Sequence, residues 1–291
     1  MNSKKIKKPD PNIWKQITTA WGKACSPSRP SLGDIKIYGK FILQSIGKKK
    51  NCRILILGAT PELRSLILKY GLSKKIDIFL LDLNLEMIRA MDEFVEIPNS
   101  KEKRVIGDWL SMPFKNEYFD LVLGDEVLIN VSLTNRNKFL MEINRVLKTS
   151  GAFITRASHE NPLAKKFTLK KALDKYSNYY LQNKLKFNQA VNYVLEEIFQ
   201  NSYFKNPKGL LSLKFLEKDC YKALKSPNPL KRLIIKTILD DYSSLFKQSW
   251  SWESRPQQLK KFKEYFQVKE SKTAHDYLYS YILPIYYLIK K

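Results

Sequence analysis

The stretch RILILGATPELRSLIL, residues 53–68, contains a continuous apolar run, a turn with a single glycine and a helical pattern. A short apolar run that ends at a glycine is typical of a buried strand. Gly58 permits a tight turn, and Pro61, with Thr60 before it and Glu62 after it, suits the start of a helix. Free N–H groups at such a start favour a carboxylate or another anion. The stretch predicts a strand, a turn and a helix, and the turn either binds a ligand or only connects the two elements.

Strand-like and helical segments continue to alternate as far as residue 156. The strand-like runs are residues 52–57, 76–82, 103–107, 119–124 and 151–156, and helical segments start at residues 61 and 85 and cover 134–148. Short apolar strands that alternate with helices indicate a parallel sheet covered on both faces. Two later runs, residues 265–270 and 279–289, would complete the sheet. The predicted fold class is α/β, with a Rossmann-like, mostly parallel seven-stranded sheet and helices on both faces.

Residues 158–258 differ in character and divide this sheet. They are rich in Lys, Leu, Tyr, Phe and Asn and contain helical patterns such as KFNQAVNYVLEEIFQ. We interpret them as a helical insertion between the fifth and sixth strands, which would form a lid or part of a substrate pocket. The core then comprises residues 51–157 and 259–291, and residues 1–50 form an N-terminal helical arm that covers the site. Within the arm, Ser31 is the expected N-cap of a helix with Asp34 in its first turn.

Acidic residues follow the second and third predicted strands. Asp82 ends the second strand 24 positions after Gly58, where a carboxylate can accept both hydroxyls of a ribose. Its alternative role is to cap the next helix. Asp108 follows the third strand, where it could accept a hydrogen bond from an adenine amino group with Trp109 beside the ring. The alternative is a polar turn residue next to a core tryptophan. Because both carboxylates fall at one edge of the sheet, we favour a nucleotide-like ligand.

The fourth strand and the segment after it extend this pattern. FDLVLGD ends in Gly124 and Asp125 at the edge where open α/β sheets bind ligands, and INRVLKTSGAFI follows. Together with GDWLSMPF, these motifs resemble those of the class I S-adenosylmethionine-dependent methyltransferases over about residues 53–156. The first turn lacks the usual GxGxG pattern of that family. LGATPEL and SPSRPSLGD instead resemble an uncharacterised "LGxTPEL" type subgroup.

The resemblance implies methyl transfer as the activity and S-adenosyl-L-methionine as the cofactor. The implied cofactor-binding residues are Gly58, Ala59, Thr60, Glu62, Asp82, Leu83, Asn84, Met87, Gly107, Asp108, Trp109, Gly124 and Asp125. GDEV after the fourth strand is not the (Asp/Asn)-Pro-Pro-aromatic signature associated with methylation of amide or exocyclic amino nitrogens. No cysteine lies at a plausible nucleophile position, which disfavours a covalent mechanism.

Three residues are candidates for a general base because each follows a predicted strand at the ligand edge: Asp125, Glu126 and His159. A loop histidine without a role is the alternative for His159. Three residues of the arm are candidate substrate contacts: Trp21, Arg29 and Tyr38. The guanidinium of Arg29 could pair with a carboxylate or phosphate in a bidentate way. Core packing of the two aromatics and a surface salt bridge of the arginine are the alternatives.

The net charge of +24 permits two interpretations of the partner. Clustered lysines would favour RNA, whereas a generally basic composition leaves an evenly basic surface. The lysines occur in short runs along the whole chain, so we favour a small-molecule or peptide-like acceptor. An RNA methyltransferase is the alternative, and a third possibility is a degenerate methyltransferase fold that only binds.

Cysteine and histidine usage predicts neither a metal site nor a disulfide framework. The chain has three cysteines far apart and two histidines, with no CxxC pair. This pattern fits a cytoplasmic location. The basic N-terminus lacks an apolar run, and the most apolar stretch, YLYSYILPIYYLI, is too short for a bilayer, so we expect neither a signal peptide nor a membrane partner.

Overall fold

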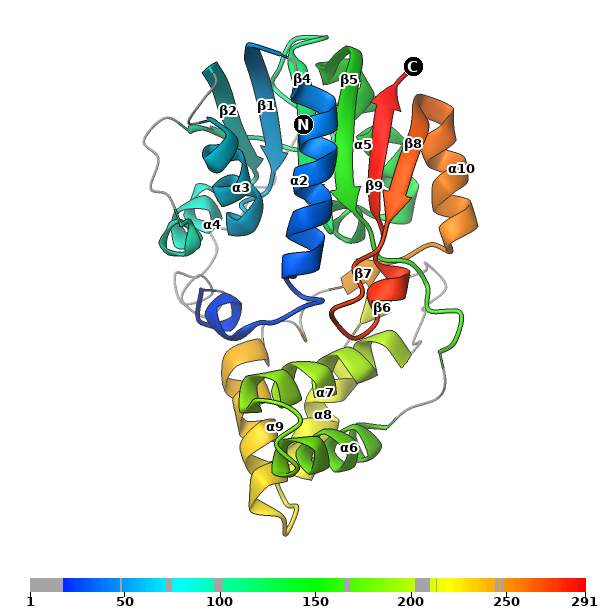
Figure 1. Cartoon of the computed structure of the whole chain (residues 1–291). Coiled ribbons are helices and arrows are strands. Elements are labelled where there is room, and N and C mark those ends of the chain that lie inside the picture. Colours follow the sequence, from blue (N-terminus) through cyan, green and yellow to red (C-terminus); the bar gives the residue numbers. More distant parts are fainter. Residues whose placement is uncertain are drawn as a thin grey trace, which may run out of the picture.

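The computed structural model describes residues 18–47, 49–71, 75–96, 102–164, 168–201, 210–212, 214–243, 246 and 249–291. Its centre is a seven-stranded sheet (Figure 1). The strands are β1 (Asn51–Leu57), β2 (Lys75–Asp82), β3 (Lys103–Ile106), β4 (Phe119–Asp125), β5 (Leu147–Arg156), β8 (Phe266–Lys272) and β9 (Ile285–Lys290).

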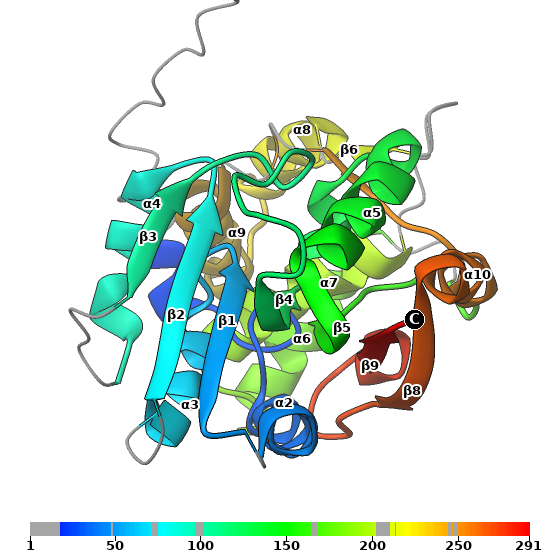
Figure 2. The same cartoon turned by 90° about the horizontal axis from the view of Figure 1, so that it is seen from above.

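The strand order is β3-β2-β1-β4-β5-β9-β8, as Figure 2 shows from above. Strands β1 to β5 pair in parallel, and β9 is antiparallel to both of its neighbours. The chain order reverses between β1 and β4, and open α/β sheets bind ligands outside the carboxyl ends of strands at such a point. The predicted seven-stranded, mostly parallel α/β fold is confirmed.

Helices cover both faces of the sheet, which explains the continuous apolar strands. On one face lie α2 (Leu32–Ile46), α3 (Pro61–Gly71) and α4 (Leu85–Ala90), and on the other lie α5 (Arg136–Val146) and α10 (Arg255–Tyr265). Successive side chains of a strand point to opposite faces. Ile54 and Ile56 therefore pack under α2 and α3, whereas Leu55 and Leu57 pack under α5.

The described part of the arm includes a helix that packs as a layer of the core. Ser31 is the N-cap of α2: its hydroxyl accepts from the Asp34 N–H at 3.0 Å, and Asp34 Oδ2 accepts from the Ser31 N–H at 3.0 Å. This reciprocal capping fixes the start of the helix, as predicted. Phe41 is fully buried against the sheet. The first 17 residues of the predicted arm lie outside the described residues.

The insertion has its own hydrophobic core below the sheet in Figure 1. It contains α6 (Leu169–Leu181), α7 (Phe187–Asn201), α8 (Lys214–Ala223) and α9 (Pro229–Tyr242). It also contains an antiparallel ribbon of β6 (Leu210–Ser212) and β7 (Ser249–Ser251), so the insertion is not wholly helical. Strands of three residues are too short to give a recognisable pattern. Among the described residues, no helix is both long and apolar enough to cross a membrane.

Two boundaries differ from the predicted ones: the end of the insertion and the start of the last strand. The helix α10 contacts α5 and β8, so elements of the core resume at Arg255, earlier than residue 259. The last strand begins at Ile285, because Tyr279 has a φ of 64° and a short 3-10 helix, Ser280–Ile282, follows it. Pro284 precedes the strand and has no N–H to donate to a ladder.

An ion pair joins the end of the insertion to the core. Arg136 at the start of α5 is 1% exposed, and its Nη1 donates to Glu253 Oε2 at 2.8 Å and to Gln258 Oε1 at 3.1 Å. The same guanidinium donates to the Ser251 carbonyl oxygen. A buried charge of this kind requires its partner.

We expect Glu253→Gln to lower the free energy of unfolding by about 3 kcal/mol, because Arg136 then keeps its buried charge without a counter-charge. Urea denaturation of the full chain measures this difference. Glu264→Gln, at an exposed position of α10, is the matched control and should leave the unfolding midpoint unchanged. Equal stability of Glu253→Gln and the wild type would contradict the assigned role of the pair.

Candidate active site

A buried cluster of charges lies where β4 and β5 end. Arg156 is fully buried, and its guanidinium donates to Asp125 from Nε and Nη2, both at 2.9 Å. Its Nη1 donates to Asp34 Oδ2 of α2 at 2.9 Å, and Nη2 donates to the Pro27 carbonyl oxygen at 3.0 Å. One guanidinium thus joins two strands, the arm and the helix α2. Asp125, a predicted base, is held in this ion pair.

Tyr38 belongs to the same cluster. It is fully buried, and its hydroxyl accepts from the Arg156 backbone N–H at 2.7 Å. The hydroxyl also lies 2.9 Å from the Gly124 carbonyl oxygen and 3.1 Å from Asp125 Oδ1, either of which can accept its proton. The structure therefore places Tyr38 in the core and not at a surface that a substrate can reach. Burial raises its pKa well above the usual value, so the hydroxyl stays protonated.

Three predicted residues face one space at the ends of β1, β2 and β3. Gly58 has a φ of +82°, a conformation that favours glycine. A Cβ at Gly58 would lie 3.7 Å from Trp109 Cζ2 and 4.0 Å from Asp82 Oδ2. The Trp109 indole donates to the Leu81 carbonyl oxygen at 2.9 Å, and the Gly58 N–H donates to the same oxygen. A side chain at position 58 would therefore contact Trp109 and Asp82, which border the same space.

Asp82 keeps hydrogen-bonding capacity toward that space. Its Oδ1 accepts from the Asn84 N–H at 2.8 Å, and burial raises the pKa of the carboxyl. Within the described residues, no lysine or arginine pairs with Asp82. Leu83, the next residue, is 66% exposed at the same strand end. A carboxylate beside an exposed apolar side chain suits a ribose with a base attached.

Glu62 and Arg29 form an ion pair on the other side of the turn. Arg29 Nε donates to Glu62 Oε1 at 2.6 Å, and its guanidinium carbon lies 5.6 Å from the Trp21 ring centroid. The guanidinium of Arg29 is therefore already paired with a carboxylate of the protein itself, in place of the predicted substrate carboxylate or phosphate. Glu62 Oε2 is buried and has no hydrogen-bond partner among the described residues. Burial raises the pKa of Glu62, and Arg29 opposes that shift.

The remaining predicted cofactor residues lie at the same strand ends but differ in exposure. Ala59 is buried after β1, Asn84 is the N-cap of α4, and Met87 packs partly against the core under α4. Asp108 is exposed and accepts from the Leu110 N–H at 2.8 Å. Thr60 precedes α3, Gly107 donates to the Asp82 carbonyl oxygen, and a Cβ at Gly124 would lie 2.7 Å from Val127 Cγ1.

A cavity of about 190 Å³ lies next to Glu126, between the strand ends, the arm and the insertion. Its lining combines two carboxylates with hydroxyl, aromatic and aliphatic side chains: Pro27, Ser28, Glu126, Ile129, Ser158, Leu195, Glu196, Phe199, Gln200, Tyr242, Trp250 and Leu283. Among the residues that the structure describes, the lining includes no lysine or arginine. The arrangement suits a small, partly apolar ligand with one cationic or hydrogen-bonding group.

Both carboxyls in this cavity have raised pKa values. Burial raises the pKa of Glu126 to about 7, with Arg156 opposing the shift and Asp125 and Glu196 adding to it. Burial also raises the pKa of Glu196 to about 6, opposed by hydrogen bonds from Ser28 and Gln200. Carboxyls that titrate near neutral pH can exchange protons with a ligand. Of the three predicted bases, Glu126 has the surroundings that suit the role best.

His159 lies outside this group. It is 2% exposed, and its Nε2 lies 2.6 Å from the hydroxyl of Tyr286, which belongs to the core under α5 and α10. Burial, with Arg255 and Arg136 nearby, lowers its pKa to about 4. The ring is therefore neutral at pH 7 and hydrogen-bonded within the core, which agrees with the alternative in which His159 has no part in catalysis.

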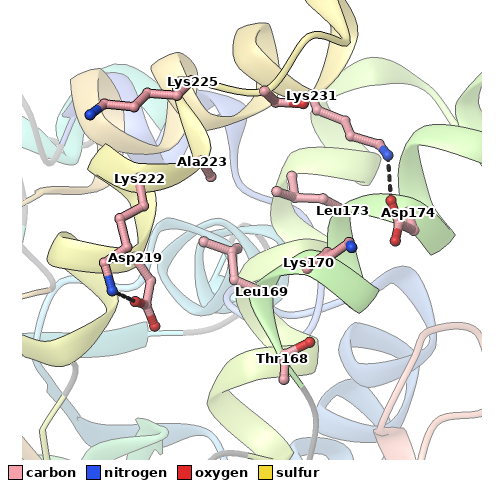
Figure 3. Close-up of a pocket in the computed structure, with 11 residues that line it drawn as sticks. Thr168, Leu169, Lys170, Leu173, Asp174, Asp219, Lys222, Ala223, Lys225 and Lys231 are labelled. Atoms are coloured by element: carbon pink, nitrogen blue, oxygen red, sulfur yellow. Dashed lines mark hydrogen bonds and ion pairs between the residues drawn. The ribbon is translucent and has the colours of Figure 1, made fainter.

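A larger cavity of about 490 Å³ lies within the insertion, between α6, α8 and the start of α9 (Figure 3). Four lysines line it together with Asp174 and Asp219. Two of these lysines are paired: Lys231 with Asp174, and Lys222 with Asp219 at 3.6 Å. It shares no lining residue with the cavity at Glu126. This cavity is therefore a separate hollow within the insertion.

Residues 58–155 match a family model described as a methyltransferase domain. The segment contains the glycine turn and every acidic residue at the ends of the first four strands. The matched segment is therefore similar to the methyltransferase domains of that family. It covers about a third of the chain, so the family model includes neither the arm, the insertion nor the last two strands of the sheet.

One curated relative and two solved structures extend the comparison. An uncharacterized protein of Methanocaldococcus jannaschii is 33% identical over 96 residues, which are 33% of this chain and 38% of that protein. A protein from Pyrococcus horikoshii has a TM-score of 0.53 at 16% identity, with 88% of this chain and 89% of that chain covered. A Rhodobacter sphaeroides protein assigned to the Zn-dependent alcohol dehydrogenases has a TM-score of 0.58 at 12% identity, with 96% and 98% covered. These two likenesses show a shared fold over most of the chain.

Several residues of the site were missed by the sequence analysis. Arg156 ends an apolar strand, Asp34 was expected only as a capping residue, and Glu196 lies in the middle of a helix of the insertion. A charged residue at the end of a buried strand signals that a partner is needed. The sequence did not reveal which residues, 31 and 122 positions away for Asp125 and Asp34, would provide it.

The raised pKa of Glu126 predicts a pH-dependent stability difference between the wild type and Glu126→Gln. The folded carboxyl favours its protonated form, so its contribution to stability is complete below pH 4.5 and is lost as the pH rises through about 7. Glutamine resembles the protonated form at every pH. Between pH 5 and pH 8, the free energy of unfolding of Glu126→Gln should therefore rise by about 2 kcal/mol relative to that of the wild type.

Urea titrations at pH 5, 6, 7 and 8 measure this gain. Glu264→Gln, an exposed position on α10, is the control and should show the same difference from the wild type at every pH. A difference for Glu126→Gln that does not change with pH would show that the carboxyl titrates in its ordinary range.

Proposed function

We propose that the protein is an S-adenosylmethionine-dependent methyltransferase of the LGxTPEL type that acts in the cytoplasm. The observation that carries the proposal is the convergence of Gly58, Asp82 and Trp109 on one space within the methyltransferase domain. All three described cysteines are free, which supports a reducing compartment.

The residues around the turn fit the parts of this cofactor. The unpaired, buried Oε2 of Glu62 would accept a hydrogen bond from the ammonium of the methionine part. The Asp82 carboxylate would accept from the ribose hydroxyls, and the sugar would lie against the backbone of the Gly58 turn. Leu83 and Trp109 would contact the adenine ring, with Asp108 beside it.

When bound, the cofactor supplies an electrophilic methyl group on a sulfonium. The chain's own contribution is to hold an acceptor atom in line with that methyl and to take up a proton. Glu126 would take the proton, because it follows β4 directly and lines the adjacent cavity. Asp125 would act as a positioning residue through its ion pair with Arg156.

The acceptor that fits the cavity is a small molecule or a single side chain of a peptide. The cavity has an acidic and aromatic lining, whereas phosphates of RNA require lysine and arginine. The basic residues are also not concentrated in the insertion: residues 158–258 contain 18 of the 52 lysines and arginines, in proportion to their share of the chain. We therefore favour the small acceptor over RNA.

Asp82→Ala should lower the affinity for S-adenosylmethionine and S-adenosylhomocysteine at least tenfold, since the variant loses the acceptor for two ribose hydroxyls. Isothermal titration calorimetry on the full chain measures this loss. Asp77→Ala is the matched control, because Asp77 lies on the same strand as Asp82. Its carboxylate oxygen Oδ1 lies 3.3 Å from Nζ of Lys103, a half-exposed side chain. Asp77→Ala should bind both ligands like the wild type.

Unchanged affinity in Asp82→Ala would contradict the proposed position of the ribose. Absence of binding by the folded wild type would contradict cofactor binding itself and would favour a degenerate fold that has lost the activity.

A further inference from the structure

The cavity at Glu126 holds two carboxylates on separate elements that approach the same space. Glu126 follows β4 with a φ of 54°, a conformation that is uncommon outside glycine. Glu196 lies on α7 of the insertion and is 8% exposed. Both side chains line the cavity together with Phe199, Tyr242 and Trp250.

The partners of the two carboxylates are hydroxyls and an amide, with no cation among them. Ser158 donates to Glu126 Oε2, and Ser28 donates to Glu196 Oε1 at 3.0 Å. Gln200 Nε2 lies 3.5 Å from Glu196 Oε2. Glu126 Oε1 is buried and has no hydrogen-bond partner in the part of the chain that the structure describes. A buried carboxylate oxygen without a donor is costly unless a ligand provides one.

The nearest cations are already committed to other anions. Arg156 pairs with Asp34 and Asp125 at 2.9 Å each, and Arg136 pairs with Glu253 at 2.8 Å. Two acidic groups therefore face a cavity whose described lining contains no lysine or arginine. A cationic ligand would supply both the missing donor and the missing charge.

We propose that the cavity binds the amine of a small aromatic or aliphatic acceptor, held through its nitrogen by Glu126 and Glu196. This inference rests on the proposed function and names its acceptor class. The aromatic side chains contact the apolar body of the ligand and attract its cationic group. The ribbon strand β7 and the helix α9 contribute Trp250 and Tyr242, so the insertion selects the acceptor.

The proposal also assigns the proton in the transfer step. The bound ammonium gives one proton to the Glu126 carboxylate and becomes a neutral amine. Its nitrogen lone pair forms the new bond to the methyl carbon, and the electron pair of the broken carbon–sulfur bond stays on sulfur. The product is an N-methylammonium, which carries the positive charge that the sulfonium has lost. No oxidant, reductant or metal takes part.

The test compares amines with alcohols of the same skeleton. Tryptamine and tryptophol, 2-phenylethylamine and 2-phenylethanol, and hexylamine and hexan-1-ol are titrated into the full chain saturated with S-adenosylhomocysteine at pH 7.5. At least one amine should bind tenfold or more tightly than its alcohol. Glu126→Gln and Glu196→Gln should each reduce that ratio at least fivefold. Glu264→Gln, at an exposed position, should preserve it.

Equal affinity of amines and alcohols would overturn the inference, as would the absence of amine binding to protein that binds S-adenosylhomocysteine. If the ratio of amine to alcohol affinity is unchanged in both Glu126→Gln and Glu196→Gln, the amine binds elsewhere and the inference is also overturned. If the wild type does not bind S-adenosylhomocysteine, the proposed function fails instead. The ratio of amine to alcohol affinity, measured without S-adenosylhomocysteine, then tests amine binding in the cavity independently of the cofactor.

Discussion

The fully buried guanidinium of Arg156 is the constraint on which the site depends. It pairs with Asp34 in α2 and with Asp125 at the end of β4, and it donates to the Pro27 carbonyl oxygen of the arm. Breaking such a buried pair costs about 3–5 kcal/mol, because the remaining charge stays in a low-dielectric interior. This cost does not mean that the ion pairs make the fold more stable than an apolar core would, because packed apolar residues of the same volume often stabilise equally well. What Arg156 determines is the position of the arm against the strand ends.

The geometry of the cavity follows from this fixed arm. With Pro27 held by Arg156, the next residue, Ser28, donates to Glu196 on the insertion. With Asp125 held in the same pair, the next residue, Glu126, turns with a positive φ and lines the cavity. Glu126 thus directly follows a member of the ion cluster, and Glu196 is connected to the cluster through Ser28 and Pro27.

The sequence was sufficient to predict features that depend on local pattern. The apolar strands, the cap of α2 at Ser31 and the carboxylate at Asp82 each follow from a few neighbouring residues. The roles of Arg156, Glu196 and Tyr38 depend on contacts across 31 to 168 positions, and no periodicity encodes them. Tyr38 shows the limit well, because an aromatic at a helical spacing suits both a substrate surface and a core. The three-residue strands of the ribbon were missed because a pattern needs more residues than they have.

The charge balance at the strand ends explains why an acidic cavity exists in a protein of net charge +24. Surface lysines act on a buried site weakly, because solvent screens exposed charges beyond about 8–10 Å at physiological salt. The local balance is one guanidinium against three nearby carboxylates, and Asp34 and Asp125 already neutralise it. Glu126 is the third carboxylate, and within the described residues no salt bridge offsets its burial. Burial therefore raises the pKa of Glu126 to about 7. A ligand that brings its own positive charge restores the balance that the protein leaves open at this position.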